Sequence, residues 1–249
     1  MKNASIISKS AQIGKNLVIG HYSVIGDNVK IGNNVKIGSN VTIHEGSVIG
    51  SYARIDDNTV IGKLPMRVRT SALDVNNSLE PCVIENNCVI GTAVILYRGC
   101  HIGAECLIAD MSTVRENVSV GNNTIIGRGV AVENCCTIGS YCKLETNVYV
   151  TAYSEIEDNV FIAPGVVTSN DKYAARGGAD AVFKGVTVKK GGRIGAQATI
   201  LPGITIGEDG FAAAGSMVTR DIPQDAIHCG NPAKYMKAVP AEQQITKNK

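Results

Sequence analysis

Aliphatic side chains return at every sixth position over most of this chain. Between residues 13 and 38, IGKNLVIGHYSVIGDNVKIGNNVKIG, an Ile-Gly pair recurs in this way without a break. Every sixth position from 7 to 61 is Ile, those from 84 to 162 are Ile, Val or Leu, and a third series from 188 to 218 is interrupted only by Ala212. An α-helix, with 3.6 residues per turn, would scatter such positions around its surface. The spacing therefore excludes a helical repeat.

The residue two places before each aliphatic anchor is also restricted, being small or β-branched nearly throughout. Two inward residues separated by one outward residue make a short strand, because side chains alternate with period two. Gly and Asn between the strands suit corners with positive φ. Three hexads close a triangular coil of eighteen residues, and stacked coils bury one another's inward faces. The pattern predicts an all-β fold, a parallel β-helix of about ten coils.

The six-residue register breaks twice, at residues 63–81 and 169–187, and the last residues leave it altogether. We expect one β-helix domain over 1–231 with two inserted loops, followed by a short C-terminal helical tail at 232–249. Loops inserted in a rigid scaffold commonly carry binding residues.

One series of corners lacks the usual glycine after the anchor. These corners follow positions 96, 114, 132, 150 and 168, and they read Tyr97-Arg98, Arg115-Glu116, Glu133-Asn134, Thr151-Ala152-Tyr153 and Ser169-Asn170-Asp171. The eighteen-residue period should stack Arg98, Glu116 and Asn134 in one column. This column is the candidate site. The alternative is a ladder of exposed ion pairs between coils, which are common and weak.

The outward positions on two of the three faces carry apolar residues, whereas the third face is mostly polar. The two apolar stripes are Val89, Leu107, Ile125, Lys143, Phe161 and Ile95, Thr113, Ala131, Tyr149, Val167. Two such faces meeting at an edge favour closed three-fold packing. We therefore expect a homotrimer with clefts between subunits near the glycine-free corners.

Composition narrows the classes of partner. The net charge is only +2, so the charge gives no reason to expect binding to nucleic acid or to an anionic membrane. No apolar run reaches the ~18 residues of a membrane span, and the first residues do not resemble a signal peptide, so we expect a cytoplasmic protein. Six of the eight cysteines, all but Cys135 and Cys229, occupy the inward small position and should act as small hydrophobes, consistent with a reducing compartment. No Cys-x-x-Cys pair has zinc spacing, and no metal is expected.

The C-terminal segments VFIAPGVVTSND, FKGVTVKKGGRIGAQATILPGITIGEDGFAAAGSMVTRDIP and GNPAK resemble the hexapeptide-repeat acyltransferases. These are trimeric left-handed β-helix enzymes that use acetyl-CoA or another acyl-CoA. The corners VREN and VEN, the segment GKLPMR and the segment SND are most similar to the sugar-nucleotide N-acetyltransferases acting on dTDP-linked amino-deoxyhexoses. The resemblance implies a left-handed coil and acyl transfer to the amine of a nucleotide-linked amino-deoxysugar, with a dTDP-3-amino-3,6-dideoxyhexose favoured.

The resemblance also implies where the two substrates bind. Acyl-CoA would lie along the C-terminal coils, where the chain offers Ala163, Gly165, Lys184, Gly185, Ala196, Ala214 and Lys234. The nucleotide sugar would bind near the first loop, where Lys63, Arg67 and Arg69 suit a pyrophosphate, although a solvated basic loop is the alternative. Further candidates for substrate binding are Arg98, Asp110, Tyr153 and Asn170.

Acyl transfer from a thioester to an amine needs a neutral, well-placed amine and hydrogen-bond donors for the oxyanion. Glu116 is the candidate to hold the amine or take its proton, and Asn134 the candidate to orient the sugar or the oxyanion. His101, the one histidine of the central run, is a third catalytic candidate, and the alternative is an ordinary surface histidine. The resemblance implies that the departing thiolate can take the final proton.

Other functions fit the same repeat, because a fold does not fix a function. An O-acyltransferase acting on a hydroxyl would depend on a histidine base, so loss of His101 would nearly abolish its activity. A zinc carbonic anhydrase would need three histidine ligands, and the central coils hold only one. A non-catalytic scaffold would not bind CoA.

Overall fold

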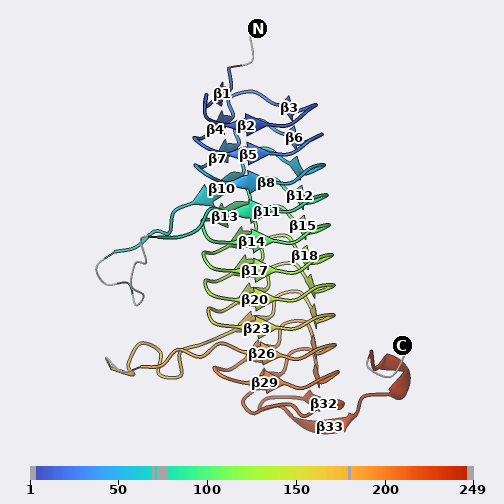
Figure 1. Ribbon diagram of the computed structural model, residues 1–249. Helices are drawn as coiled ribbons and strands as arrows, with labels where there is room; N and C mark the ends of the chain where they lie inside the picture. The colour runs from blue at the N-terminus through green and yellow to red at the C-terminus, as the bar shows by residue number, and fades with distance from the viewer. Residues whose placement is uncertain (1–3, 69–70, 72–77, 179–180, 246–249) are drawn as a thin grey trace.

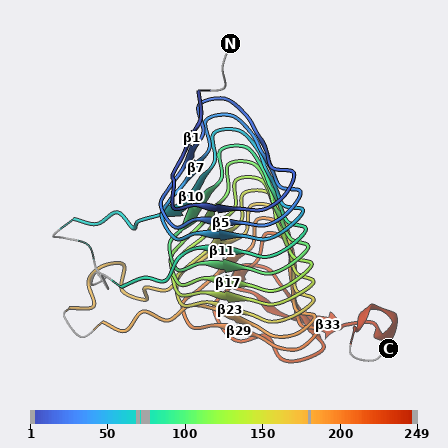
Figure 2. The ribbon, with the colours of Figure 1, turned by 45° about the horizontal axis from the view of Figure 1, so that its top comes forward.

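The computed structural model describes residues 4–68, 71, 78–178 and 181–245, and the chain forms a left-handed parallel β-helix with three flat faces (Figures 1 and 2). Each coil contributes one short strand to each face. Strands pair with the equivalent strand of the next coil, so that Leu107 and Ile108 lie opposite Ile125 and Ile126, eighteen residues later. The inward hexad positions therefore form continuous columns, as the sequence predicts.

The three sheets are named A, B and C in the order in which the chain visits them. Sheet A contains β1 (Ile6–Ile7), β4 (Val24–Ile25), β7 (Thr42–Ile43), β10 (Val60–Lys63), β13 (Ile95–Tyr97), β16 (Thr113–Val114), β19 (Ala131–Val132), β22 (Tyr149–Val150), β25 (Val167–Thr168), β28 (Thr199–Ile200) and β31 (Met217–Val218). Sheet B contains β2 (Gln12–Ile13), β5 (Lys30–Ile31), β8 (Val48–Ile49), β11 (Val83–Ile84), β14 (His101–Ile102), β17 (Ser119–Val120), β20 (Thr137–Ile138), β23 (Glu155–Ile156), β26 (Thr187–Val188) and β29 (Thr205–Ile206). Sheet C contains β3 (Val18–Ile19), β6 (Lys36–Ile37), β9 (Arg54–Ile55), β12 (Val89–Ile90), β15 (Leu107–Ile108), β18 (Ile125–Ile126), β21 (Lys143–Leu144), β24 (Phe161–Ile162), β27 (Arg193–Ile194), β30 (Phe211–Ala212), β32 (Ala226–Cys229) and β33 (Lys234–Ala238).

The stack is slightly longer than expected and ends differently. It has about twelve coils instead of ten, and β32 extends sheet C beyond β30. The expected C-terminal helix is wrong: Lys234–Ala238 is a strand antiparallel to β32, and the only helical turn described after it is the short 3₁₀ helix η1 (Ala241–Gln243). The last coil would otherwise expose an unpaired strand edge, and a returning strand satisfies its backbone groups.

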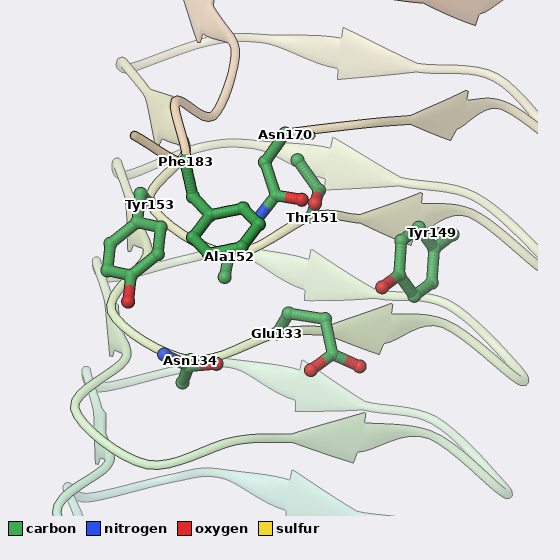
Figure 3. A pocket seen from close by; sticks show the side chains of 8 residues that line it. All are labelled: Glu133, Asn134, Tyr149, Thr151, Ala152, Tyr153, Asn170 and Phe183. Atoms are coloured by element: carbon green, nitrogen blue, oxygen red, sulfur yellow. The ribbon is translucent and has the colours of Figure 1, made fainter. Parts of the chain in front are cut away.

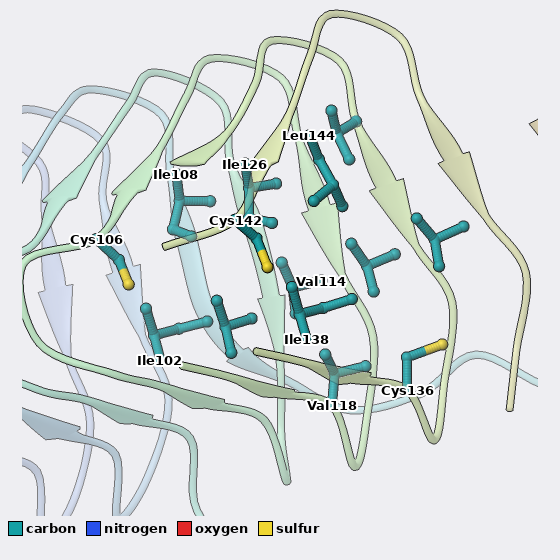
Figure 4. Close-up of a cluster of buried hydrophobic side chains, with 14 of the residues drawn as sticks. Ile102, Cys106, Ile108, Val114, Val118, Ile126, Cys136, Ile138, Cys142 and Leu144 are labelled. Carbon is teal, nitrogen blue, oxygen red and sulfur yellow. The ribbon is translucent and has the colours of Figure 1, made fainter. Parts of the chain in front are cut away.

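The interior of the prism is almost entirely aliphatic, with cysteine and other small residues beside the larger anchors (Figure 4). The six inward cysteines are buried and unpaired, which confirms that they act as small hydrophobes. Burial raises the pKa of Cys136 to about 12 and that of Cys142 to about 11, so both thiols stay protonated in the core.

Close approach of successive coils explains the glycine that follows many of the anchors. A side chain at Gly139 would place its Cβ 2.6 Å from the backbone nitrogen of Asp158 in the next coil. Positive φ falls instead two residues further along, often on an asparagine such as Asn28 or Asn123. At the corners between sheets A and B after β13, β16, β19 and β22, larger side chains replace this glycine.

Both inserted loops leave the solenoid at the corner between sheets A and B, which we call the A/B corner. The first loop joins β10 to β11 and the second joins β25 to β26, and in Figure 1 both project from the same side of the stack. Four A/B corners, those after β13, β16, β19 and β22, lie between them along that edge. The loops therefore enclose the stretch of the A/B corner that lacks glycine. No helix among the described residues is long and apolar enough to cross a membrane.

Candidate active site

The glycine-free residues lie at the A/B corner immediately after β13, β16, β19 and β22. Stacked strands stand about 4.8 Å apart, so side chains from neighbouring coils are within hydrogen-bond reach. The corner of each coil hydrogen-bonds to the next: the backbone N–H of Cys135 donates to the carbonyl of Glu116 at 3.1 Å. The column predicted from the eighteen-residue period is therefore present, with Arg98, Glu116 and Asn134 on successive coils.

Glu116 is the most enclosed charged group of this column, with 2% of its side chain exposed. Arg115 donates two hydrogen bonds to the Glu116 carboxylate, from Nε to Oε2 at 2.8 Å and from Nη2 to Oε1 at 3.0 Å. Arg67 of the first loop approaches Oε1 to 3.4 Å. Such planar bidentate pairs are strong and directional, so the Glu116 carboxylate is fixed in place.

Arg115 also links Glu116 to the coil above. Its Nη1 donates to Oε2 of Glu133 at 3.0 Å. Beneath it lies the buried ring of Tyr97, 5.1 Å from the guanidinium carbon, with the ammonium of Lys63 5.4 Å from the same ring. Both approaches are cation–π contacts, which hold the two cations against the base of the column.

A pocket of about 210 Å³ opens beside Glu133, between the column and the second loop (Figure 3). Its lining is Glu133, Asn134, Tyr149, Thr151, Ala152, Tyr153, Asn170 and Phe183. The Phe183 ring, from the second loop, lies between Tyr153 and Tyr149 in this view. We call this the acidic pocket, because Glu133 is the one carboxylate in its lining.

Burial shifts the titration of the groups around the acidic pocket. It raises the pKa of the Glu133 carboxyl, an effect that the nearby Arg115 opposes and the Glu116 charge reinforces. Burial also raises the pKa of Tyr149 and of Tyr153. Both phenols are therefore neutral donors near pH 7, and Glu133 is the anionic group of the pocket.

A second pocket of about 550 Å³ lies over the second loop and shares Asn170 with the first. Among the described residues, its lining includes the cations Lys172, Arg176 and Lys184 together with Tyr173, and no carboxylate. No ion pair joins these three cations to any carboxylate in the described part of the chain. The nearby Asp171 accepts the backbone N–H of Tyr173 at 2.8 Å and so braces the loop. We call this the basic pocket.

The cations of the first loop are arranged differently from the pyrophosphate site expected for them. Arg67, with 16% of its side chain exposed, is directed at Glu116, and Lys63 lies over Tyr97. Arg98 donates from Nε to the carbonyl of Leu79 and from Nη1 to that of Glu45, both at 2.9 Å. These side chains brace the loop and the column. Arg69 lies outside the described residues.

Two predicted residues lie away from the A/B corner. His101 stands on the outer surface of sheet B, where its Nε2 is 3.3 Å from Oε1 of Glu85. Asp110 follows β15 at the corner between sheets C and A, where its Oδ1 accepts the backbone N–H of Thr92 at 2.9 Å. Asp110 thus connects two coils, and neither residue joins the cluster around Glu116.

The residues expected to bind acyl-CoA fall into separate groups. Ala163, Gly165, Ala196 and Ala214 stack at the corner between sheets C and A, where the backbone N–H of Gly215 donates to the carbonyl of Ala196 at 2.8 Å. Lys184 and Gly185 end the second loop at the A/B corner, and Lys234 begins β33. A single chain therefore does not bring these residues into one site.

Several residues of the site were not among the predicted binding residues. Arg115 and Glu133 occupy the position of the missing glycine, so the signal that pointed to Glu116 and Asn134 applied equally to them. Tyr149 belongs to the outward stripe of sheet A. Phe183 lies in the second loop, where no repeat pattern places a side chain.

The outward apolar stripes are exposed on this chain. Val89, Leu107, Tyr149 and Phe161 have 37–38% of their surface exposed, and Val167 has 45%. Sheets A and C therefore carry the apolar surface from which a homotrimer is predicted. Among the described residues no group of three or more His, Cys, Asp or Glu side chains could hold a metal ion.

Sequence models of two repeat families match this chain. The bacterial transferase hexapeptide (six repeats) matches residues 10–45 and 81–116, and the hexapeptide repeat of succinyl-transferase matches 113–152 and 185–220. Together these stretches cover more than half of the chain and follow the coils on both sides of the two loops.

Two curated proteins are similar over shorter stretches. The dTDP-3-amino-3,6-dideoxy-alpha-D-galactopyranose 3-N-acetyltransferase of Aneurinibacillus thermoaerophilus is 52% identical over 52 residues, 21% of this chain and 27% of that protein. A putative acetyltransferase of Saccharomyces cerevisiae is 38% identical over 63 residues, 25% of this chain and 32% of that protein. The chain thus matches about a third or less of the length of these relatives.

Solved structures share the fold over nearly the whole chain. The UDP-N-acetylglucosamine acyltransferase of Arabidopsis superposes with a TM-score of 0.65 at 18% identity, covering 96% of this chain and 74% of that one. The enzyme of Francisella novicida gives 0.53 at 23% identity, covering 94% and 69%. At these identities the likeness establishes the β-helix and nothing finer.

Proposed function

We propose that this chain, which belongs to the hexapeptide-repeat family, is an acyl-CoA-dependent acyltransferase. Its acceptor is the amine of a nucleotide-linked amino-deoxysugar, with a dTDP-3-amino-3,6-dideoxyhexose favoured, and its donor is acetyl-CoA or another short acyl-CoA. The proposal rests on the charge arrangement at the A/B corner and is supported by the similarity to sugar and other acetyltransferases.

The observation that carries the acceptor assignment is the pair of adjoining pockets. The acidic pocket presents Glu133 and the basic pocket presents three cations, and Asn170 lines both. A nucleotide-linked amino sugar has the complementary charges, an ammonium group on the sugar and a diphosphate beside it. Charge-assisted hydrogen bonds at both ends would orient the sugar between them. We therefore propose that the diphosphate binds at the second loop, whereas the first-loop cations are directed at the column.

One of the similar curated proteins supports an amino sugar nucleotide as the acceptor. The 52% identical stretch belongs to a protein named as a 3-N-acetyltransferase of a dTDP-linked 3-amino sugar. Its match to a quarter of that protein's length supports the class of acceptor without identifying the sugar.

The acyl-CoA would lie against the corner between sheets C and A. Ala163, Gly165, Ala196 and Ala214 leave that corner without bulky side chains, so a pantetheine arm could run along the stacked backbone. Because this corner and the pockets lie on different edges of the prism, a closed homotrimer would bring one subunit's small-residue corner to the next subunit's pockets. The exposed stripes of sheets A and C would form the contact.

The bound ammonium must first lose one proton to solvent, because only the neutral amine can attack the thioester carbonyl. A carbon–nitrogen bond forms, the carbon–sulfur bond breaks, and the amine's proton leaves with the CoA thiolate. Binding both substrates in the correct orientation supplies much of the acceleration. Asn134, whose amide lines the acidic pocket, would hold the sugar or the carbonyl oxygen. Glu116, held on both oxygens by arginines, would position Arg115 instead of taking a proton.

The test is direct turnover. The protein is incubated with acetyl-CoA and a panel of dTDP- and UDP-linked 3-amino and 4-amino sugars, each with its hydroxyl counterpart, and products are read by mass spectrometry. An increase of one acetyl group on one amino sugar nucleotide, without the same increase on its hydroxyl counterpart, is the expected result. CoA binding without acetylation of any amino sugar would overturn the proposal.

O-acylation of a hydroxyl is the second candidate, and one observation bears on it. His44 lies at the A/B corner, and burial, with Arg98 and Lys63 nearby, lowers its pKa, so it is a neutral base near pH 7. However, β7 lies four strands from β19, roughly 19 Å at 4.8 Å per strand, and neither pocket is lined by a histidine in the described part of the chain. His101→Ala and His44→Ala should therefore both leave most activity intact. Loss of nearly all turnover in either variant would favour the hydroxyl acceptor.

A further inference from the structure

We propose that Glu133, and not Glu116, recognises the acceptor's nitrogen and makes the enzyme prefer an amine to a hydroxyl. This inference deepens the proposed function and rests on it. It assigns the specificity of the site to a residue one coil beyond the carboxylate that the sequence favours.

Glu116 has no free surface with which to meet a substrate. Its Oε2 accepts from Arg115 Nε, and its Oε1 accepts from Arg115 Nη2, with Arg67 Nη2 at 3.4 Å. Only 2% of the side chain is exposed, and it is not among the residues that line the acidic pocket. A ligand amine would have to displace an arginine to reach it.

Glu133 has the opposite arrangement. Its Oε2 is held by Arg115 Nη1 at 3.0 Å, while no hydrogen bond reaches Oε1 from any described residue. The side chain is 24% exposed and lines the pocket, where Figure 3 shows the carboxylate between Asn134 and Tyr149. One oxygen is thus fixed by the column, and the other is available to a ligand.

The surroundings of that free oxygen favour a cationic or strongly donating group. The rest of the lining is aromatic, small or neutral, so Glu133 is the one charged group that the lining presents to a ligand, with Arg115 holding its other oxygen from outside the pocket. An ammonium or amine offers two or three N–H donors, and a bond from a charged donor to a carboxylate is roughly twice as strong as a neutral one. A hydroxyl at the same carbon offers one neutral donor. We therefore assign the difference in affinity between the amine and the hydroxyl ligand to Glu133.

The test measures binding of two ligands that differ at one atom. Isothermal titration calorimetry measures the binding of an amino-deoxysugar nucleotide that the enzyme acetylates, and then of its hydroxyl counterpart. The full-length protein is used in its native oligomeric state, without acetyl-CoA. The wild-type protein should bind the amino sugar about tenfold or more tightly, the size expected of a hydrogen bond to a charged group. Glu133→Gln should reduce that ratio to about one, because the amide keeps the shape and loses the charge.

Two controls separate recognition from structure. Glu116→Gln should weaken both ligands in similar proportion and keep the ratio, since it acts through Arg115. Glu157→Gln, which breaks the exposed pair with Lys189 on another edge, should change neither affinity. If Glu133→Gln fails to fold, Glu133→Ala serves instead: it also removes the charge and should likewise reduce the ratio to about one.

The outcomes distinguish this inference from the proposed function. If the wild-type protein acetylates no amino sugar, the proposed function fails first and the ratio is meaningless. If it acetylates one, and Glu133→Gln still prefers the amine by the wild-type ratio, the inference is overturned. A ratio lost in Glu116→Gln but kept in Glu133→Gln would return the role to Glu116.

Discussion

Arg115 and Glu116, consecutive in the chain, form a two-bonded ion pair, Nε to Oε2 at 2.8 Å and Nη2 to Oε1 at 3.0 Å. Neighbours in an extended segment normally point to opposite sides, so the pair depends on the tight corner between sheets A and B. The same guanidinium holds Glu133 of the next coil at 3.0 Å. One arginine therefore sets the positions of two carboxylates, one enclosed and one facing a pocket.

Removal of this arginine should be costly for stability. Arg115→Met leaves the enclosed Glu116 with only the longer contact to Arg67, and stranding a buried charge costs about 3–5 kcal/mol in the free energy of unfolding. Adding Glu116→Gln in the same chain should recover part of that loss. Urea denaturation of the two single variants and the double variant measures the coupling between the residues.

The matched control for that experiment is Arg54→Met. Arg54 pairs with Asp56 at 2.7 Å, but 61% of its side chain is exposed, and such surface pairs contribute about 1 kcal/mol or less. If Arg115→Met cost no more than Arg54→Met, the column would not be the anchored structure described above.

The basic pocket should determine affinity for the nucleotide part of the acceptor. Lys172→Ala and Arg176→Ala should each raise the KM for the nucleotide sugar, by about tenfold for a bond between charged groups, with little change in kcat. Steady-state kinetics with each substrate varied in turn gives KM and kcat separately. Lys30→Ala, on the exposed surface of β5, is the control and should change neither constant.

Phosphate groups occur in both substrates, and the same kinetics distinguish them. An increase in the KM for acetyl-CoA, with that for the sugar unchanged, would show that the basic pocket holds the CoA phosphates. It would contradict the assignment of the diphosphate to the second loop.

Binding of the amino sugar should depend on pH through Glu133. Burial raises the pKa of this carboxyl, Arg115 opposes the rise, and Glu116 adds to it, with Tyr149 and Cys136 the other titratable groups nearby. The carboxylate loses its charge as pH falls through that raised pKa, while the sugar ammonium keeps its own. Affinity measured without acetyl-CoA should therefore fall on acidification, and at a higher pH than an ordinary glutamate would give.

The Glu133→Gln variant supplies the comparison for this profile. Its affinity for the amino sugar should be weak and nearly independent of pH over the same range. A variant that retained the wild-type acid limb would locate the titrating group elsewhere in the site.

Thiol labelling should report the packing of the core. Cys135 and Cys229 are exposed, whereas the other six cysteines are buried, and burial raises the pKa of Cys136 to about 12. Ellman's reagent should therefore modify two thiols in the native protein and all eight after denaturation. Cys135 follows Asn134 at the edge of the acidic pocket, so its modification should slow acyl transfer, and Cys135→Ser should be resistant.

The labelling result is easily contradicted. Rapid reaction of more than two native thiols would mean that the coils open on the time scale of labelling. Full activity after Cys135 is modified would place the reacting groups away from this corner.

The repeat makes most of the fold readable from the chain. Each coil contacts the coil eighteen residues away, so the spacing of Ile25, Ile43 and Ile61 identifies both the inward column and the strand partners. The inward cysteines followed from the same count. An unbroken series of glycine-free corners, from Tyr97 to Ser169, indicated the edge that carries the site.

The roles of individual side chains at that edge were decided by the tertiary structure. The repeat placed Glu116 and Glu133 on neighbouring coils, but which of them is enclosed and which faces a pocket depends on where Arg115 and the distant Arg67 point. Phe183 and the cations of the second loop reach the site from a segment without periodicity. The C-terminal strand likewise forms because the last coil offers an unpaired edge. Sequence spacing determines contacts that repeat at a fixed interval, and contacts between a loop and a distant coil have no such interval to read.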